Sequence, residues 1–237
     1  MGTRTVLGAC LGATALAASS VALSDEFQDG LFAIQRGYAA ASVLATPAAQ
    51  VEAYKPLVVK AKEFREAFPK KAQALIWEAV VLTHYAWTLN NGDSLAMLKT
   101  ARDRLEEAEK ADAANVDWSG YSFMGITYAL APAWPISFGD KGRARGYLEK
   151  AVSMQPNAID TNFYLGRFLF NNKHYPEAVA AFEKALSGTS IARSGPGLAG
   201  ADGSQIWCNA MNCPEPADSA AKLQAEARRM LDTAKTK

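Results

Sequence analysis

A pattern of small and bulky residues recurs in the chain at a fixed interval of 34 residues. Each copy has an alanine, a large apolar residue four positions later, and a second alanine three positions after that. The two clear copies are Ala144–Leu148–Ala151 and Ala178–Phe182–Ala185. Because steps of four and three follow the helical period, the members of a copy share one face of a helix. A fixed period of this length is typical of proteins built from repeated helix pairs.

A glycine precedes each copy within an apolar stretch of helical spacing, Gly125 before the first and Gly166 before the second. Small residues on two neighbouring antiparallel helices allow the backbones to approach each other closely. The bulky residue then fills the space beside the contact. The pattern therefore predicts helices packed in pairs as hairpins.

These residues resemble the tetratricopeptide repeat, whose signature has Leu-Gly in helix A, then Ala, a bulky residue and Ala in helix B, and a final proline. The matching residues are Leu165, Gly166, Ala178, Phe182 and Ala185 in one unit and Gly125, Ala144, Leu148, Ala151 and Pro156 in the unit before it. The resemblance implies an all-α superhelix of helical hairpins with flanking helices. It also implies a concave groove that binds a protein or peptide partner.

Weaker copies extend the repeat toward the N-terminus. One has Ala101, Leu105 and Ala108 in its second helix, and its first helix is expected over Lys71–Leu89. Val51–Pro69 is expected to be the second helix of a degenerate first unit. An amphipathic helix over residues 25–45, interrupted at Gly30 and Gly37, precedes it.

The remaining segments complete the expected organisation of the chain. A charged helix over Ala217–Lys235 has Leu223, Ala227, Met230 and Leu231 on one side, and a solenoid needs such a helix to cover its last face. The expected segments are a signal peptide (1–24), N-terminal helices (25–69), three repeats (70–187), a Gly-, Ser- and Pro-rich loop (188–217) and a capping helix (218–237).

The N-terminus has the features of an export signal. Arg4 precedes an uncharged run, Val6 to Leu23, and small residues at Ala22 and Ser24 offer a cleavage site. We therefore expect a periplasmic or secreted protein, with a retained membrane anchor as the alternative. Lipid attachment at Cys10 is disfavoured because only about four apolar residues precede it.

The cysteines and histidines limit the chemistry of the chain. Cys208 and Cys213 lie close together in the C-terminal loop, and in an oxidising compartment such a pair predicts a disulfide. A zinc site would need more ligands than His84 and His174 supply at that distance. Neither histidine belongs to a nucleophile–base motif, and no phosphate-binding glycine loop is present in the sequence. We therefore expect a protein that is not an enzyme and has no cofactor or metal.

The net charge and one insertion bear on the partner. A formal net charge of +1 gives no general electrostatic case for nucleic acid or for an anionic membrane. Between two helices of a repeat, Pro132 and Pro135 are expected to end the first, and Asp140 to cap the second near Lys141. We expect the apolar residues between them to pack onto the adjacent helix pair, and the alternative is a partner-binding rim. These residues are Trp134, Ile136 and Phe138.

The insertion and the helix that follows it resemble a group of exported proteobacterial repeat proteins. The matching features are Trp134-Pro135, Phe138-Gly139-Asp140, Pro156, Asp160 and Asn162-Phe163, within about residues 75–186. The chain is more distantly similar to the repeat-containing accessory component of TRAP-type transporters. That resemblance implies, as an alternative function, a small-molecule or lipid-binding accessory protein of solute uptake. The group often has an Arg-rich stretch after the last repeat, whereas this chain has glycine, serine and two cysteines there.

We expect the partner to contact mainly the first helix of each unit, because those helices line the concave side of such a superhelix. Aromatic residues and arginine are the usual anchors of an interface. Because the same helices also pack the solenoid, many of the candidates are expected to be core residues. The candidates are Trp77, His84, Tyr85, Tyr121, Phe123, Tyr128, Trp134, Phe138, Phe163, Tyr164 and Arg167.

Overall fold

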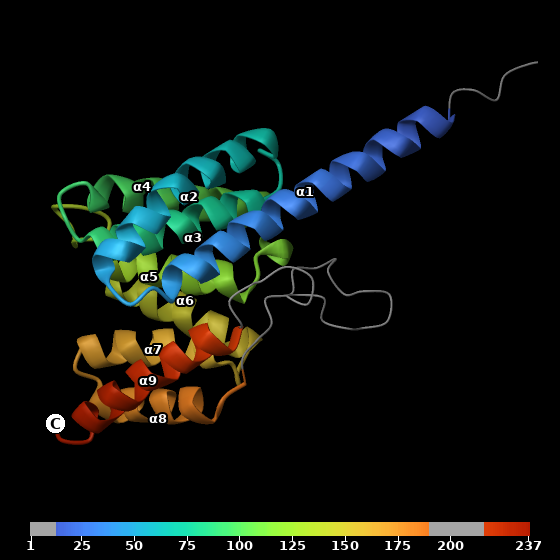
Figure 1. Cartoon of the computed structure of the whole chain (residues 1–237). Coiled ribbons are helices and arrows are strands. Elements are labelled where there is room, and N and C mark those ends of the chain that lie inside the picture. The colour runs from blue at the N-terminus through green and yellow to red at the C-terminus, as the bar shows by residue number, and fades with distance from the viewer. Residues whose placement is uncertain (1–12, 190–215) are drawn as a thin grey trace, which may run out of the picture.

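The computed structural model describes residues 13–189 and 216–237, and these residues fold almost entirely as helices (Figure 1). Within them the regular structure is helical and the only β-type contacts are two isolated bridges. The helices are α1 (Ala13–Ser42), α2 (Pro47–Ala67), α3 (Ala72–Leu89), α4 (Ser94–Asp112), η1 (Ala113–Asn115), α5 (Trp118–Leu130), α6 (Lys141–Met154), α7 (Ile159–Asn171), α8 (Tyr175–Ser187) and α9 (Pro216–Ala234).

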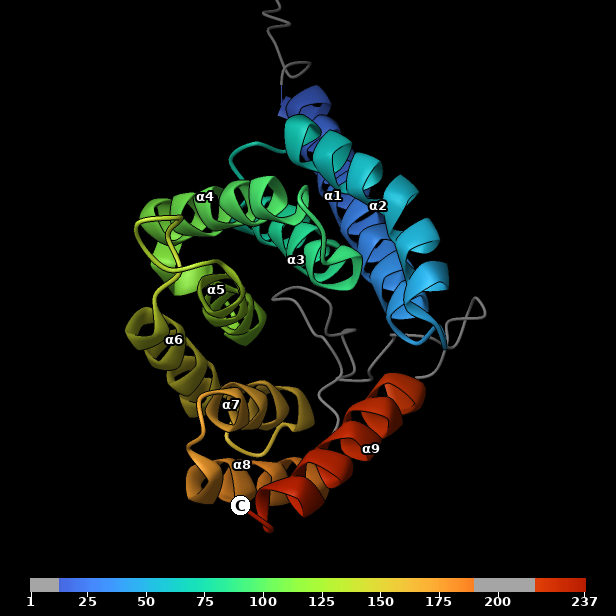
Figure 2. The ribbon, with the colours of Figure 1, turned by 90° about the vertical axis from the view of Figure 1, so that its left-hand side faces the viewer.

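Consecutive helices pack as antiparallel hairpins, which confirms the predicted all-α hairpin repeat fold. The pairs α3–α4, α5–α6 and α7–α8 follow one another along a curved path, with α1–α2 before them. Figure 2 shows α3, α5 and α7 on the inner side of the curve and α4, α6 and α8 on the outer side. Helix α9 packs against α7 and α8 and reaches α1, so the two ends of the described fold meet.

The small residues of the repeat lie where helices cross. A Cβ atom added at Gly125 would lie 2.5 Å from Leu148 Cγ and 2.9 Å from the Ala144 carbonyl oxygen. A Cβ atom added at Gly166 would lie 2.8 Å from two ring carbons of Phe182. Glycine is therefore needed at both positions for the two helices of each hairpin to lie as close together as they do.

The predicted interruption of the first helix was wrong. Helix α1 continues through Gly30 and Gly37, and a Cβ atom added at either position would lie 2.7 Å from a side chain of α2, the Phe64 ring or a Leu57 methyl. These glycines permit close packing of α2 and do not break the helix. As at Gly125 and Gly166, the absence of a side chain lets the neighbouring helix approach closely. The predicted signal-peptide cleavage site falls inside α1, and cleavage stays a prediction.

Trp134 and Ile136 do not pack as expected. Phe138 is partly buried and contacts a small cluster that includes Leu98 and Ala131. The side chains of Trp134 and Ile136 are 85% and 73% exposed. The expectation that all three would be buried was therefore wrong for two of them. Helix α5 ends before Pro132 as predicted, the Trp134–Pro135 peptide bond is cis, and Asp140 Oδ1 accepts a hydrogen bond from the Arg143 amide at 2.9 Å.

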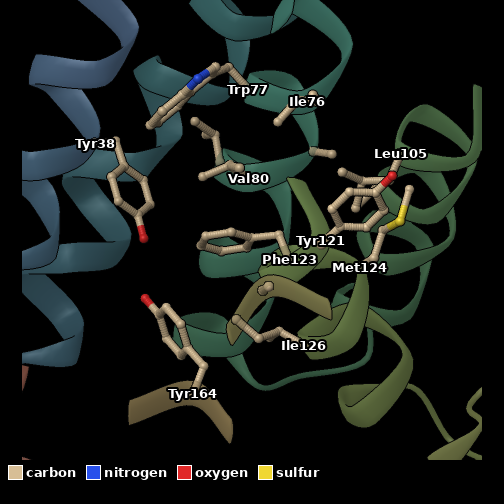
Figure 3. Close-up of a cluster of buried hydrophobic side chains, with 14 of the residues drawn as sticks. Tyr38, Ile76, Trp77, Val80, Leu105, Tyr121, Phe123, Met124, Ile126 and Tyr164 are labelled. Carbon is tan, nitrogen blue, oxygen red and sulfur yellow. The ribbon is translucent and has the colours of Figure 1, made fainter. Parts of the chain in front are cut away.

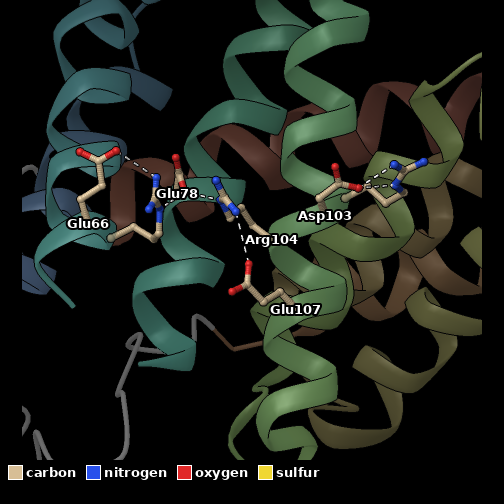
Figure 4. Close-up of polar contacts among 7 residues, drawn as sticks. Glu66, Glu78, Asp103, Arg104 and Glu107 are labelled. Atoms are coloured by element: carbon tan, nitrogen blue, oxygen red, sulfur yellow. Dashed lines mark hydrogen bonds and ion pairs between the residues drawn. The ribbon is translucent and has the colours of Figure 1, made fainter. Parts of the chain in front are cut away.

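The core combines an aromatic cluster with one buried carboxylate that two arginines share. Figure 3 shows Tyr38 of α1, Phe123 of α5 and Tyr164 of α7 converging beside α3. The Glu78 side chain, only 5% exposed, accepts hydrogen bonds from Arg65 Nε of α2 and Arg104 Nε of α4, both at 2.9 Å (Figure 4). A single carboxylate of α3 thus ties together three consecutive helices.

Candidate functional site

A pocket of about 390 Å³ opens on the inner side of the curved array. It is lined by the C-terminal part of α1, the start of α2, the end of α3, one face of α7 and the first half of α9. The lining combines aromatic rings with charged side chains from helices far apart in sequence. Its principal residues are Tyr38, His84, Trp87, Tyr164, Arg167, Lys222 and Glu226.

The α3 wall of the pocket is an aromatic stack around His84. The imidazole lies between the rings of Tyr54 and Trp87, with centroids 5.2 and 5.5 Å away and interplanar angles of 26° to each. His84 Nδ1 is 2.9 Å from the hydroxyl of Tyr38. These contacts hold the ring in place as part of the wall.

Arg167 is the central cation of the pocket. Its guanidinium lies 3.6 Å from the centroid of the Trp87 ring, and Nη1 is 3.3 Å from Glu226 Oε1 of α9. Burial lowers the pKa of Arg167, and the Glu226 carboxylate opposes that effect. Arginine remains charged over the physiological range, so the side chain offers a stacked, oriented guanidinium at the pocket surface.

Lys222 closes the other side of the pocket. Its Nζ donates to the carbonyl oxygen of Ser42 at 2.5 Å and lies 3.5 Å from that of Leu44. These carbonyls lie at the C-terminal end of α1, where a cation interacts favourably with the helix dipole. Burial lowers the pKa of Lys222. The contact joins α9 to the turn after α1 and completes the inner wall.

A second, smaller pocket of about 100 Å³ continues the groove toward the end of α5. It shares Trp87, Tyr164 and Arg167 with the larger pocket and adds Leu130 and Phe168. The inner face therefore offers a track from α9 to the last turn of α5, with the stacked Arg167 and Trp87 at its middle.

The predicted candidates fall into three groups. His84, Phe163, Tyr164 and Arg167 line the larger pocket. Phe138 and Trp134 belong to the insertion, the first partly buried and the second exposed. The others are buried in the core, as expected for many of them: Trp77, Tyr85, Tyr121, Phe123 and Tyr128.

Several pocket residues escaped the sequence reasoning. Trp87 lies one helical turn after His84, so the helix A pattern already contained the signal for it. Tyr38 lies in a unit too degenerate to be aligned with the repeat. Lys222 and Glu226 share one face of α9 at a spacing of four, but their position opposite α7 depends on how the array curves.

Metal-binding and membrane-spanning features were sought in the described part of the chain. There, no group of three or more His, Cys, Asp or Glu side chains is placed to hold a metal ion. Residues 13–189 and 216–237 also contain no helix that is both long and apolar enough to cross a bilayer. Cys208 and Cys213 lie outside the described residues, and their disulfide stays a prediction.

Comparison with known proteins identifies the fold. The sequence matches no protein-family model and no curated protein. A solved structure of a thermophilic TPR protein from Thermus thermophilus is similar, with a TM-score of 0.51 and 14% identity over 78% of this chain and 77% of that one. The structure of pilF from Pseudomonas aeruginosa gives a TM-score of 0.33 at 20% identity over 88% and 93%. At such identities the first likeness bears on architecture alone, and it supports a tetratricopeptide-like array of helical hairpins.

Proposed function

We propose that this chain is an exported, non-enzymatic interaction scaffold that binds a segment of a protein partner along its concave face. The observation that carries the proposal is the pocket in which Trp87, Tyr164 and Arg167 converge from α3 and α7. Tryptophan, tyrosine and arginine are the residues that most often dominate binding energy at protein interfaces. Export rests on the sequence of residues 1–24.

The shape and chemistry of the groove favour a peptide segment. Its two pockets share Trp87, Tyr164 and Arg167, and such neighbouring pockets suit an extended or helical chain better than a compact ligand. Aromatic surfaces lie beside charged groups such as Arg167 and Glu226. The groove can thus take apolar side chains and orient polar groups along the same segment.

A small-molecule or lipid-binding accessory role is the second candidate from the sequence. It predicts an enclosed apolar pocket beneath Trp134 and Phe138. Trp134 is 85% exposed, and Phe138 packs against Ala131 and against Leu98 of α4. No observation favours this candidate over a protein partner, and the solute-transport resemblance does not add one.

The proposal is tested by crosslinking inside the cell. A photo-reactive phenylalanine analogue replaces Thr88, which lines the pocket, or Val59, which is exposed on α2 and serves as the matched control. We expect one identified protein to be crosslinked from position 88 and not from position 59. The binding of that purified protein is then measured against the Thr88→Trp and Val59→Trp variants.

Thr88→Trp fills part of the pocket and is expected to weaken binding by about tenfold or more. Val59→Trp is expected to leave the affinity unchanged, because Val59 is exposed on α2 away from the pocket. Equal thermal melting of the two variants excludes a folding defect. A purified partner that binds Thr88→Trp as tightly as the unmodified chain would contradict the proposal.

A further inference from the structure

We propose that the loop of residues 131–140, hereafter the Trp134 loop, inserts Trp134 and Ile136 into an apolar recess of the same protein that occupies the concave pocket. The inference rests on the proposed function and adds a second contact to it. The two side chains are the most exposed large apolar groups in the described residues. Three features of the loop and its surroundings carry the inference.

First, the backbone of the Trp134 loop is fixed by its own hydrogen bonds. The Gly139 amide donates to the Pro132 carbonyl at 2.9 Å, and the Ile136 amide donates to the Ala133 carbonyl at 3.1 Å. The Asp140 amide donates to the Tyr128 carbonyl of α5 at 3.2 Å. A Cβ atom at Gly139 would lie 2.0 Å from the Ala131 carbonyl oxygen, so the two ends of the loop are in close contact. Such a loop presents its side chains with little backbone ordering cost on binding.

Second, the anchoring of the loop does not involve the two exposed side chains. Phe138 packs edge-on against Tyr128, with ring centroids 5.6 Å apart, and the Arg102 guanidinium lies over the Phe138 ring, 4.5 Å from its centroid. Phe138 therefore holds the loop on α4 and α5. Trp134 and Ile136 take no part in this anchor and remain in solvent, where large apolar groups held together mark an interaction surface.

Third, the loop begins beside the smaller pocket. It begins directly after Leu130, a residue that is itself exposed and lines the smaller pocket together with Trp87 and Arg167. A partner segment leaving the groove at the end of α5 thus meets the Trp134 loop next. This adjacency points to one partner for both surfaces.

Two other binding partners of the Trp134 loop, a second copy of the chain and a membrane surface, fit the observations less well. Trp134 and Ile136 together expose on the order of 300 Å², whereas a stable interface needs about 800 Å² on each side, so contact between two copies through this loop alone is too small. A membrane surface would be favoured by unpaired cations. Arg102 is paired with Asp103 at 2.6 Å, and Arg143 with Glu106 at 3.2 Å. Lys141, directly after the loop, has no ion pair in the described part of the chain, and a single lysine adds only a weak attraction to an anionic surface.

The test uses the full chain and the partner identified by crosslinking from Thr88. A photo-reactive residue at position 134 is expected to crosslink that same protein. The double variant Trp134→Ser with Ile136→Ser is expected to weaken the binding of the purified partner by about tenfold or more. Val59→Ser, which removes an exposed apolar side chain from α2, is the matched control and is expected to bind normally. Unchanged thermal melting of the double variant shows that the loop substitutions leave the fold intact.

The outcomes separate the inference from the proposed function. If position 88 crosslinks a partner that binds the double variant normally, or that position 134 never reaches, the Trp134 loop has no such role and the groove proposal stands. If position 88 yields no partner, both fail. Concentration-dependent dimers in sedimentation, or binding to mixed phosphatidylcholine and phosphatidylglycerol vesicles, overturn the inference if the double variant abolishes them. They then assign the loop to self-association or to a membrane.

Discussion

Replacing Gly125 with alanine provides a direct test of the packing rule that defines the fold. The new Cβ atom would lie 2.5 Å from Leu148 Cγ and 2.9 Å from the carbonyl oxygen of Ala144. Leu148 can rotate away, but the Ala144 oxygen belongs to the backbone of α6. The substitution therefore forces α5 and α6 apart at their crossing.

Two opposing terms set the size of the effect. Alanine in place of glycine within a helix stabilises it by about 1 kcal/mol, while overpacking of a close-packed contact costs about 1–3 kcal/mol. At Gly125 the backbone contact places the cost at the upper end of that range. We expect a net destabilisation of about 1–2 kcal/mol. This corresponds to a fall in melting temperature of roughly 2–8 °C for a chain of this size.

Gly146 provides the control, because it lies within the same hairpin and a Cβ atom added there would have no neighbour within 4 Å. Gly146→Ala retains only the propensity gain and is expected to stabilise the protein by about 1 kcal/mol. Thermal and urea unfolding followed by circular dichroism at the helical band measure both variants. If Gly125→Ala were as stable as Gly146→Ala, the close approach of α5 and α6 would not be what requires glycine, and the reasoning would be refuted.

Three further predictions concern polar contacts. Glu78→Gln removes the buried carboxylate that Arg65 and Arg104 share and leaves them only the exposed Glu66 and Glu107, so it is expected to destabilise the fold by about 2 kcal/mol in urea unfolding. Glu107→Gln, which removes only the exposed partner of Arg104, is expected to cost less than about 0.5 kcal/mol in the same assay. Burial and a hydrogen bond to Glu106 raise the pKa of Tyr128 above its ordinary value of 10.0, so the stability that Tyr128 contributes is fully present below pH 10.0 and is lost as the pH rises further. The stability of Tyr128→Phe is therefore expected to fall less steeply than that of the unmodified chain when urea unfolding is measured at increasing pH above 10.0, and an equal slope would contradict this. Lys222→Met removes the donor to the Ser42 carbonyl and is expected to speed amide hydrogen exchange in the first half of α9 and in the turn after α1, while exchange in α3 to α6 stays unchanged.

The sequence was sufficient to predict the hairpins because their determinants are local. The spacing of Ala144, Leu148 and Ala151 specifies one helix face, and Asp140 and Pro132 mark helix boundaries within a few residues. Gly30 and Gly37 were misread because glycine has two roles in a helix. It weakens the helix locally and it admits a close neighbour, and only the position of α2 decides between them.

The candidate site was less predictable because it depends on the curvature of the whole array. His84, Tyr164 and Arg167 could be chosen as aromatic or arginine residues of the inner helices. Lys222 and Glu226 lie beside them because α9 packs back against α7 and reaches α1, and no local sequence pattern predicts that packing. The exposure of Trp134 was unpredictable for a related reason. An apolar residue in a loop has no periodic neighbours that indicate whether it is covered.

Helix α9 links the stability of the array to the shape of its pocket. Ala227, Met230 and Leu231 bury its apolar side on the last repeat, so it acts as the cap that a solenoid requires. Its other side supplies Glu226 to Arg167 and Lys222 to the end of α1. A partner bound between α3 and α7 would therefore also contact or order the cap. Because binding and ordering are coupled reciprocally, a change that loosens α9 on α8 is expected to weaken binding even where it touches no residue of the groove.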